Sequence, residues 1–114
     1  MAVIRIREYL DSSGASPWAE WRRSLDAEAR AKVTIALYRM GEGNFSNVKG
    51  VGAGVFERVL DWGPGYRIYF AKDGEAIVIL LGGSSKKGQQ RAIANAKQHW
   101  EDYRRRKAGG KAWH

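Results

Sequence analysis

The chain has 114 residues, of which 44% are hydrophobic, so it is long enough to form one domain around its own core. It contains no cysteine, which excludes disulfides, thiolate metal sites and thiol nucleophiles, and its two histidines are too few for a histidine-rich zinc site. The net charge of +8 is concentrated late in the chain, where residues 49–114 carry thirteen Lys and Arg against six Asp and Glu. This excess favours a polyanionic partner such as nucleic acid, with solubility and a basic tail as the simpler explanation.

No apolar run approaches the roughly 18 residues of a membrane-spanning helix, and the N-terminus has no signal-peptide core. We therefore expect a soluble, cytoplasmic protein without a membrane partner. The segment GGSSKKG lacks the spacing of a nucleotide-binding phosphate loop. We expect no cofactor and no metal.

The N-terminal part of the chain predicts one strand and two helices. Alternation in AVIRIRE, residues 2–8, indicates a strand. Ser16 can cap a helix that has Pro17 at its first position, and Asp26 can cap a second helix. The apolar stripe of the second helix consists of Val33, Ala36, Leu37 and Met40.

The remaining sequence predicts a loop, three strands and a helix. Residues 44–54, NFSNVKGVGAG, are rich in glycine and are expected to form a loop. Three extended runs follow, VFERVLD, YRIYFAKD and EAIVILLG, and the short turns between them predict an antiparallel meander. The IVILL run is continuously apolar, as in a strand buried on both faces. The apolar face of the last helix consists of Ile93, Ala96, Trp100 and Tyr103.

This order of elements predicts the α+β class, with a small, mainly antiparallel sheet, two N-terminal helices packed on it and a C-terminal helix. We expect the helices to stack on one face of the sheet. A single domain would span residues 1–107, and residues 108–114 would form a flexible tail.

The hairpin segment GPGYRIYFAKDG carries an arginine in the middle of a strand. Period-two alternation places Tyr66, Ile68 and Phe70 on the core face. Arg67 and Tyr69 would then stand together on an open face. The other interpretation is that Arg67 only solvates that face.

Further charged residues can converge on Arg67. The preceding strand has two alternating sets of side chains, one with Arg58 and one with Glu57, and the hairpin register decides which set joins Arg67. The turn after the last strand adds several cations, and the long loop adds one more. The residues concerned are Lys86, Lys87, Arg91 and Lys49.

Such a surface suits a phosphodiester. Cationic side chains can hold the phosphate and stabilise the additional charge of a pentacoordinate intermediate, and Tyr69 can stack on bases. RNA can be cleaved without a metal because its own 2′-hydroxyl attacks the phosphate. Glu57 is a possible general base, and a lysine or a tyrosine could serve instead.

Three motifs together resemble a known family. The stretches GNFSNVKGVGAGVFE, GPGYRIYF and ILLGGSSKKGQQRAI are similar to those of the RelE/ParE superfamily of bacterial toxins, specifically its HigB-like addiction module killer proteins. The resemblance runs from about Ile4 to about Trp100. It implies a RelE-like (microbial ribonuclease-like) fold, with the N-terminal strand inserted beside the antiparallel strands.

The resemblance also implies a function and partners. The chain would be the toxin of a type II toxin-antitoxin system that cleaves mRNA, commonly in the ribosomal A site. A cognate antitoxin, often a small helix-turn-helix protein, would mask the site, and operator DNA would be contacted only through that antitoxin.

The resemblance assigns roles to individual residues. Arg67 matches the phosphate-binding arginine of the family, Lys86 and Lys87 match its basic turn, and Lys49 matches its loop lysine. We expect Arg67, Lys86, Lys87 and Arg58 to be catalytic. The residues expected to bind RNA are Lys49, Tyr69, Arg91 and Gln89.

The chain departs from the family pattern at three places. Arg58 stands one position early, with Val59 where the arginine is expected, and Gly88 and Ala92 replace the usual Arg and Asp. Two other interpretations therefore remain open. One is an inhibitor of DNA gyrase that lacks nuclease activity, as in ParE-type members, and the other is a degenerate toxin that only binds its antitoxin.

Overall fold

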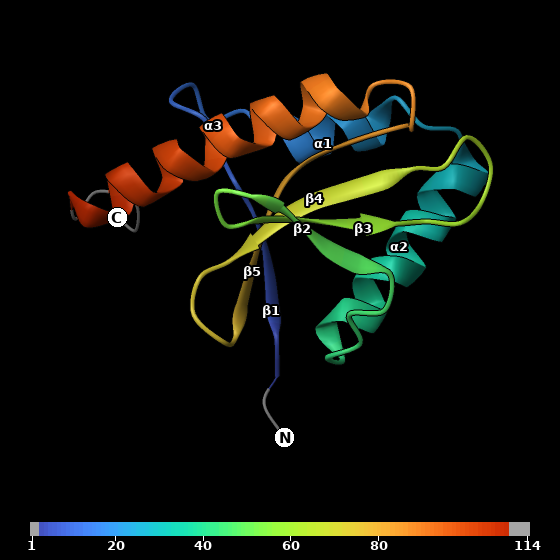
Figure 1. The fold of residues 1–114 in the computed structure, drawn as a ribbon, viewed down its shortest axis with the longest axis horizontal. Coiled ribbons are helices and arrows are strands. Elements are labelled where there is room, and N and C mark those ends of the chain that lie inside the picture. Colours follow the sequence, from blue (N-terminus) through green and yellow to red (C-terminus); the bar gives the residue numbers. More distant parts are fainter. Residues whose placement is uncertain (1–2, 110–114) are drawn as a thin grey trace.

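One mixed sheet organises residues 3–109, the part of the chain that the computed structural model describes (Figure 1). The strand order is β1-β5-β4-β3-β2, with β1 parallel to β5 and the other neighbours antiparallel. This confirms the predicted mainly antiparallel sheet. In chain order the elements are β1 (Arg5–Glu8), α1 (Pro17–Arg23), α2 (Ala27–Gly41), β2 (Val48–Gly52), β3 (Val55–Val59), β4 (Arg67–Lys72), β5 (Ile77–Ser84) and α3 (Gln89–Ala108).

Both N-terminal helices begin at the predicted caps. The Ser16 hydroxyl accepts a hydrogen bond from the backbone N–H of Ala19 at 3.0 Å, and Pro17 occupies the first turn. The Asp26 carboxylate accepts from the N–H of Ala29 at 2.8 Å. Each side chain satisfies a donor that has no partner within the helix, so the starts follow from local chemistry.

The predicted loop 44–54 contains a strand, and that prediction was wrong. β2 pairs with β3, with a bulge between Gly50 and Gly52. The connection to β3 uses positive φ angles at Gly52, Ala53 and Gly54, which makes a tight turn possible. The glycines that suggested a loop therefore form the turn and the bulge. Hydrogen bonding to β3 holds the rest of the segment in an extended conformation.

The sheet is covered on both faces, whereas the sequence predicted helices on one. On one face α1 and α2 enclose the first core cluster, which includes Trp18, Val33 and Phe70. On the other face α3 encloses a second cluster, which includes Tyr69 and Trp100. The prediction of one open face was wrong because α3 folds back over it.

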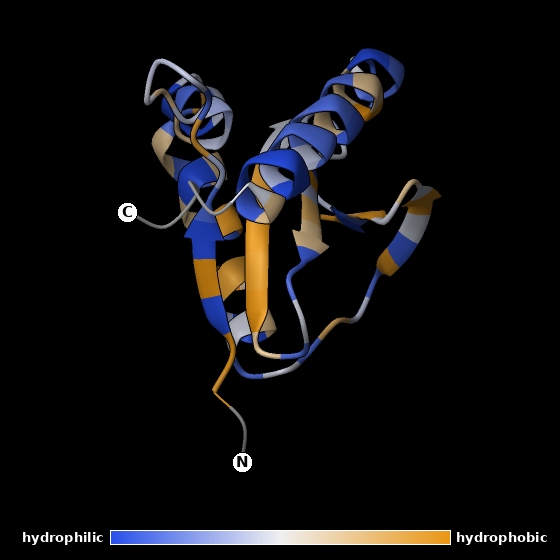
Figure 2. Cartoon of the chain, turned by 90° about the vertical axis from the view of Figure 1, so that its left-hand side faces the viewer, coloured by the Kyte–Doolittle hydropathy of each residue, from blue (hydrophilic) through white to orange (hydrophobic). Residues whose placement is uncertain are grey.

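Strand β5 lies between these layers. Figure 2 shows alternating hydrophilic and hydrophobic residues along β1, near the labelled N-terminus, and a continuous hydrophobic stretch along the neighbouring β5. Four successive residues of β5, from Val78 to Leu81, are at most 2% exposed. The prediction of a strand buried on both faces is confirmed.

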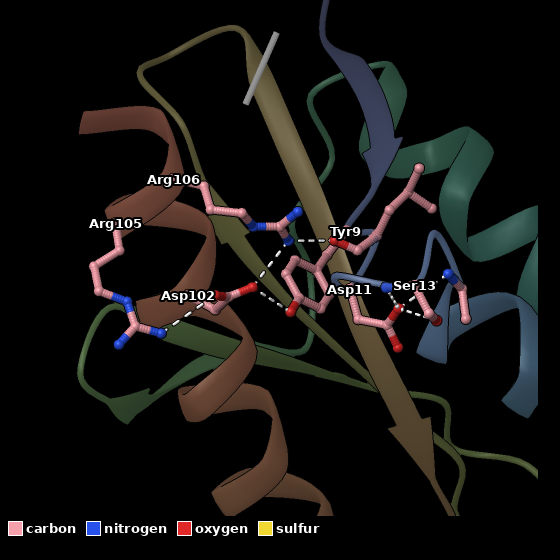
Figure 3. A network of polar contacts seen from close by, with 8 residues as sticks. Tyr9, Asp11, Ser13, Asp102, Arg105 and Arg106 are labelled. Atoms are coloured by element: carbon pink, nitrogen blue, oxygen red, sulfur yellow. Dashed lines mark hydrogen bonds and ion pairs between the residues drawn. The ribbon is translucent and has the colours of Figure 1, made fainter. Parts of the chain in front are cut away.

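Two polar networks hold the C-terminal half of α3 on the sheet. Tyr9 donates from its hydroxyl to Asp102 at 2.6 Å, and Arg106 pairs with the same carboxylate at 2.9 Å (Figure 3). On the other side of the helix, the Tyr103 hydroxyl donates to Asp73 at 2.6 Å. These contacts join segments far apart in the sequence and fix the layer that covers the second face.

No helix within residues 3–109 is long and apolar enough to cross a membrane. Of the predicted tail 108–114, Ala108 is the last residue of α3, and residues 110–114 lie outside the described residues.

Candidate functional site

The strand register places the predicted site residues in a row across the sheet. Lys49 on β2 pairs with Glu57 on β3, which pairs with Tyr69 on β4. Directly paired residues point to the same face, here the face covered by α3. Arg67 is paired with Val59 and therefore lies diagonally next to Glu57 on that face.

Glu57 is the centre of the cluster. Its side chain is fully buried, and its carboxylate lies 3.4 Å from Lys49 Nζ and 3.8 Å from Arg67 Nε. The side-chain amide of Gln89, in the first turn of α3, donates to both carboxylate oxygens at 3.0 and 3.2 Å. A buried carboxylate requires such partners, so Glu57 orders the groups around it.

Arg67 is held by one hydrogen bond, but its guanidinium group has a further donor without an acceptor. Its side chain is 10% exposed, and Nη1 donates to the carbonyl of Gly65 at 2.6 Å. Its Nε is buried and has no hydrogen-bond partner within the described part of the chain. A buried donor without an acceptor is unfavourable, and the nearest anionic oxygen, that of Glu57 at 3.8 Å, is too far away for a hydrogen bond.

The basic turn after β5 lies beside Arg67. Lys86 donates its backbone N–H to the carbonyl of Pro64 at 3.3 Å. Both Lys86 Cβ and Arg67 Nη1 are within 4 Å of the position that a Cβ on Gly65 would occupy. Lys86 and Lys87 are exposed, so the turn adds accessible charge next to the buried arginine.

Tyr69 is not available for stacking on bases, which corrects the sequence prediction. It is 0% exposed in the second core cluster, and its hydroxyl shares a hydrogen bond of 2.9 Å with the Ser84 hydroxyl. Burial raises the pKa of Tyr69 above its ordinary value. No sequence pattern indicated Ser84, because only the register of β4 and β5 brings the two hydroxyls together.

Arg58 lies on the opposite face, away from Arg67, so the structure does not place it in the predicted site. It pairs with Val48 and Ile68, which belong to the core between the sheet and α2. Alternation along β3 cannot bring Glu57 and Arg58 to one face. Arg91 is exposed in the first turn of α3, and no hydrogen bond or ion pair found among residues 3–109 joins it to the Glu57 cluster.

The assembled cluster therefore consists of Lys49, Glu57, Arg67 and Gln89, flanked by Lys86 and Lys87. It can bind an anion through charge-assisted hydrogen bonds on the face of the sheet that α3 covers. Among residues 3–109, no group of three or more His, Asp or Glu side chains is arranged to hold a metal ion.

Comparisons with known proteins find a related sequence and a similar structure. No protein-family model matches the chain. An uncharacterized protein of Haemophilus influenzae is 41% identical over 69 residues, which cover 60% of this chain and 70% of that protein. A structure of the E. coli toxin RelE, a mutant with two arginines changed to alanine, in the free state, matches with a TM-score of 0.62. That match has 16% identity and covers 86% of this chain and 97% of the RelE chain. The chain therefore belongs to the same protein family as the Haemophilus influenzae protein, and its fold is the RelE-like fold predicted from the sequence.

Proposed function

We propose that this chain is the toxin of a type II toxin-antitoxin module, of the HigB-like kind, and that it stops growth by cleaving mRNA on the ribosome. The observation that carries the proposal is the Arg67 guanidinium, which is nearly buried, lies 3.8 Å from the Glu57 carboxylate without a hydrogen bond at Nε, and stands beside exposed lysines. The RelE-like fold of the chain is consistent with it.

The cluster suits phosphodiester chemistry. Arg67 and Lys86 would bind the scissile phosphate and stabilise the charge that develops when the 2′-hydroxyl attacks phosphorus. Glu57 lies beneath these cations with no exposed surface, and it already accepts hydrogen bonds from Gln89. These contacts support a positioning role for Glu57, which would fix Arg67 and Lys49 before RNA arrives.

The direct test is to induce the chain in bacteria and map the 5′ ends of transcripts. Wild type should arrest growth and produce new internal 5′ ends, while Arg67→Ala should lose both effects. Because Arg67 is nearly buried, the exposed double variant Lys86→Ala, Lys87→Ala tests the same site without a folding risk. Arg5→Ala, an exposed arginine on the opposite edge strand, is the matched control.

Ribosome dependence is tested with purified protein. We expect cleavage of a translated mRNA and little cleavage of the same mRNA without ribosomes. Growth arrest with intact transcripts would contradict the nuclease proposal, and inhibition of DNA gyrase in a supercoiling assay would then favour the ParE-like alternative.

A degenerate toxin is the second candidate, and the position of Arg58 favours it. With Arg58 on the other face, the cluster has one arginine fewer than the family pattern implies. Antitoxin binding without any growth arrest would identify this case.

A cognate antitoxin, a small helix-turn-helix protein, is the proposed partner. A groove of about 840 Å³ between β1, α1 and α2 supports a protein partner, because it is lined by Ile4, Ile6 and Tyr38. Tyr38 is 68% exposed, and exposed aromatic residues beside an apolar groove are typical of protein interfaces. Tyr38→Glu should weaken co-purification with the antitoxin and leave RNA cleavage unchanged; equal co-purification would contradict this location.

A further inference from the structure

A second cationic pocket lies on the other face of the sheet, between α2 and the end of β3. Its volume is about 290 Å³. One wall comes from a single side of α2, where Lys32 and Arg39 are seven residues apart and therefore about two turns apart on one face. The other wall includes Asn47, Arg58 and Trp62.

Arg58 is the buried member of this pocket. It is 5% exposed, and its Nη1 donates to the carbonyl oxygen of Asn44 at 2.9 Å. No carboxylate lies within ion-pair distance of it among residues 3–109. Burial, and then the charge of Arg39, hold the pKa of Arg58 below its ordinary value. An arginine nevertheless keeps its charge in proteins, so the fold contains a desolvated cation without a counter-ion.

The surrounding charges do not compensate Arg58. Three cations line the pocket, Lys32, Arg39 and Arg58, against one carboxylate, Asp61, a net formal charge of +2. Asp61 is exposed and makes no ion pair with any of the three. Lys32 instead lies over the ring of Trp62, 5.5 Å from its centroid. A bound anion would supply the missing negative charge.

We propose that this pocket binds a phosphate group. Three cationic side chains around one small cavity match the three non-bridging oxygens of a phosphate monoester better than the two oxygens of a carboxylate. A free phosphate ester is therefore the expected ligand, and a nucleic-acid backbone, whose phosphodiester has two non-bridging oxygens, is the other source that the test separates. The pocket is separate from the Glu57 cluster, because alternation along β3 directs Arg58 and Glu57 to opposite faces. The proposal therefore does not depend on the nuclease function.

The test is a titration of isotope-labelled protein followed by NMR at constant ionic strength. The signals to follow are the Nε–H of Arg58 and the indole N–H of Trp62. Inorganic phosphate and adenosine 5′-monophosphate should shift both signals with saturation, while acetate and adenosine should not. A dinucleotide that has only an internal phosphodiester separates the two sources. If the pocket takes terminal phosphates, adenosine 5′-monophosphate should bind more tightly than the dinucleotide.

Variants assign the binding to this pocket. Arg58→Met should weaken phosphate binding about tenfold or more, because a buried charge-assisted contact is lost. Lys32→Gln and Arg39→Gln should each weaken it about two- to fivefold, since both side chains are exposed. If Arg58→Met does not fold, the double variant of the two exposed residues still tests the pocket. Arg5→Ala, an exposed arginine of the edge strand β1, should bind phosphate like wild type.

Three results would overturn the proposal. The first is the absence of a saturable shift at Arg58 and Trp62. The second is a shift that Arg67→Ala removes, because the phosphate would then be bound by the Glu57 cluster. The third is acetate binding as tightly as phosphate, which would make the pocket a carboxylate site.

Discussion

Replacing Glu57 by glutamine tests whether this carboxylate holds the cationic cluster together. The substitution keeps the shape of the side chain, removes its charge and replaces one acceptor oxygen by an NH2 donor. Arg67, with a side chain that is 10% exposed, then loses the counter-ion 3.8 Å from its Nε, and Gln89 loses a charged acceptor. A buried arginine without a counter-ion is strongly unfavourable, so we expect Glu57→Gln to destabilise the fold.

The magnitude follows from the two ion pairs of Glu57. Breaking a buried ion pair by removing one partner costs about 3–5 kcal/mol, and the lower end applies here because 3.8 Å exceeds hydrogen-bond length. The Lys49 contact adds at most about 1 kcal/mol, since that side chain is 65% exposed. We therefore expect a loss of about 3 kcal/mol. At this chain length 1 kcal/mol corresponds to roughly 4 °C, so Tm should fall by about 12 °C.

The assay is thermal and urea-induced unfolding of wild type, Glu57→Gln and Glu101→Gln. Glu101 is an exposed residue of α3 without an ion pair among residues 3–109, so its variant should unfold like wild type. The double variant Glu57→Gln, Arg67→Met should recover part of the lost stability, because it removes the unpaired charge as well. A fall in Tm below about 2 °C for Glu57→Gln, or a double variant as unstable as the sum of the single ones, would refute the reasoning.

Two further predictions concern packing and pH. In Gly83→Ala the new Cβ would lie 2.3 Å from the Trp21 ring, so the ring must move and stability should fall by about 1–3 kcal/mol in urea unfolding. Gly88→Ala, whose Cβ would have its nearest neighbour at 3.8 Å, is the control, and equal effects would contradict the clash. Burial, followed by the Asp102 hydrogen bond, raises the pKa of Tyr9 from 10.0 to about 12. The folded state therefore holds this proton more tightly, and the resulting stability is present below pH 10 and is lost as pH rises through about 12. Tyr9→Phe should lack this loss of stability between about pH 10 and 12, and identical profiles of stability against pH for the two proteins would contradict the prediction.

Much of the helical structure was predictable from the sequence. The caps at Ser16 and Asp26 act within four residues, and the apolar face of α3 follows from a period of 3.6. The β2 strand was not predictable in this way, because its order depends on a partner strand and its glycines also suit a loop. The RelE-like fold came from motifs that resemble a family, and the structural match confirms it.

The sequence by itself therefore determined which residue types the site contains, the helix starts and the apolar faces, because these depend on composition and on interactions within a few residues. The tertiary structure decided which side chains meet. Register put Lys49, Glu57 and Tyr69 in one row and sent Arg58 to the α2 face, since neighbouring residues of a strand point to opposite sides. The return of α3 over the second face then buried Glu57 and Tyr69 and nearly buried Arg67. No local pattern encodes that coverage, because it depends on contacts between segments far apart in the chain, such as Tyr9 with Asp102.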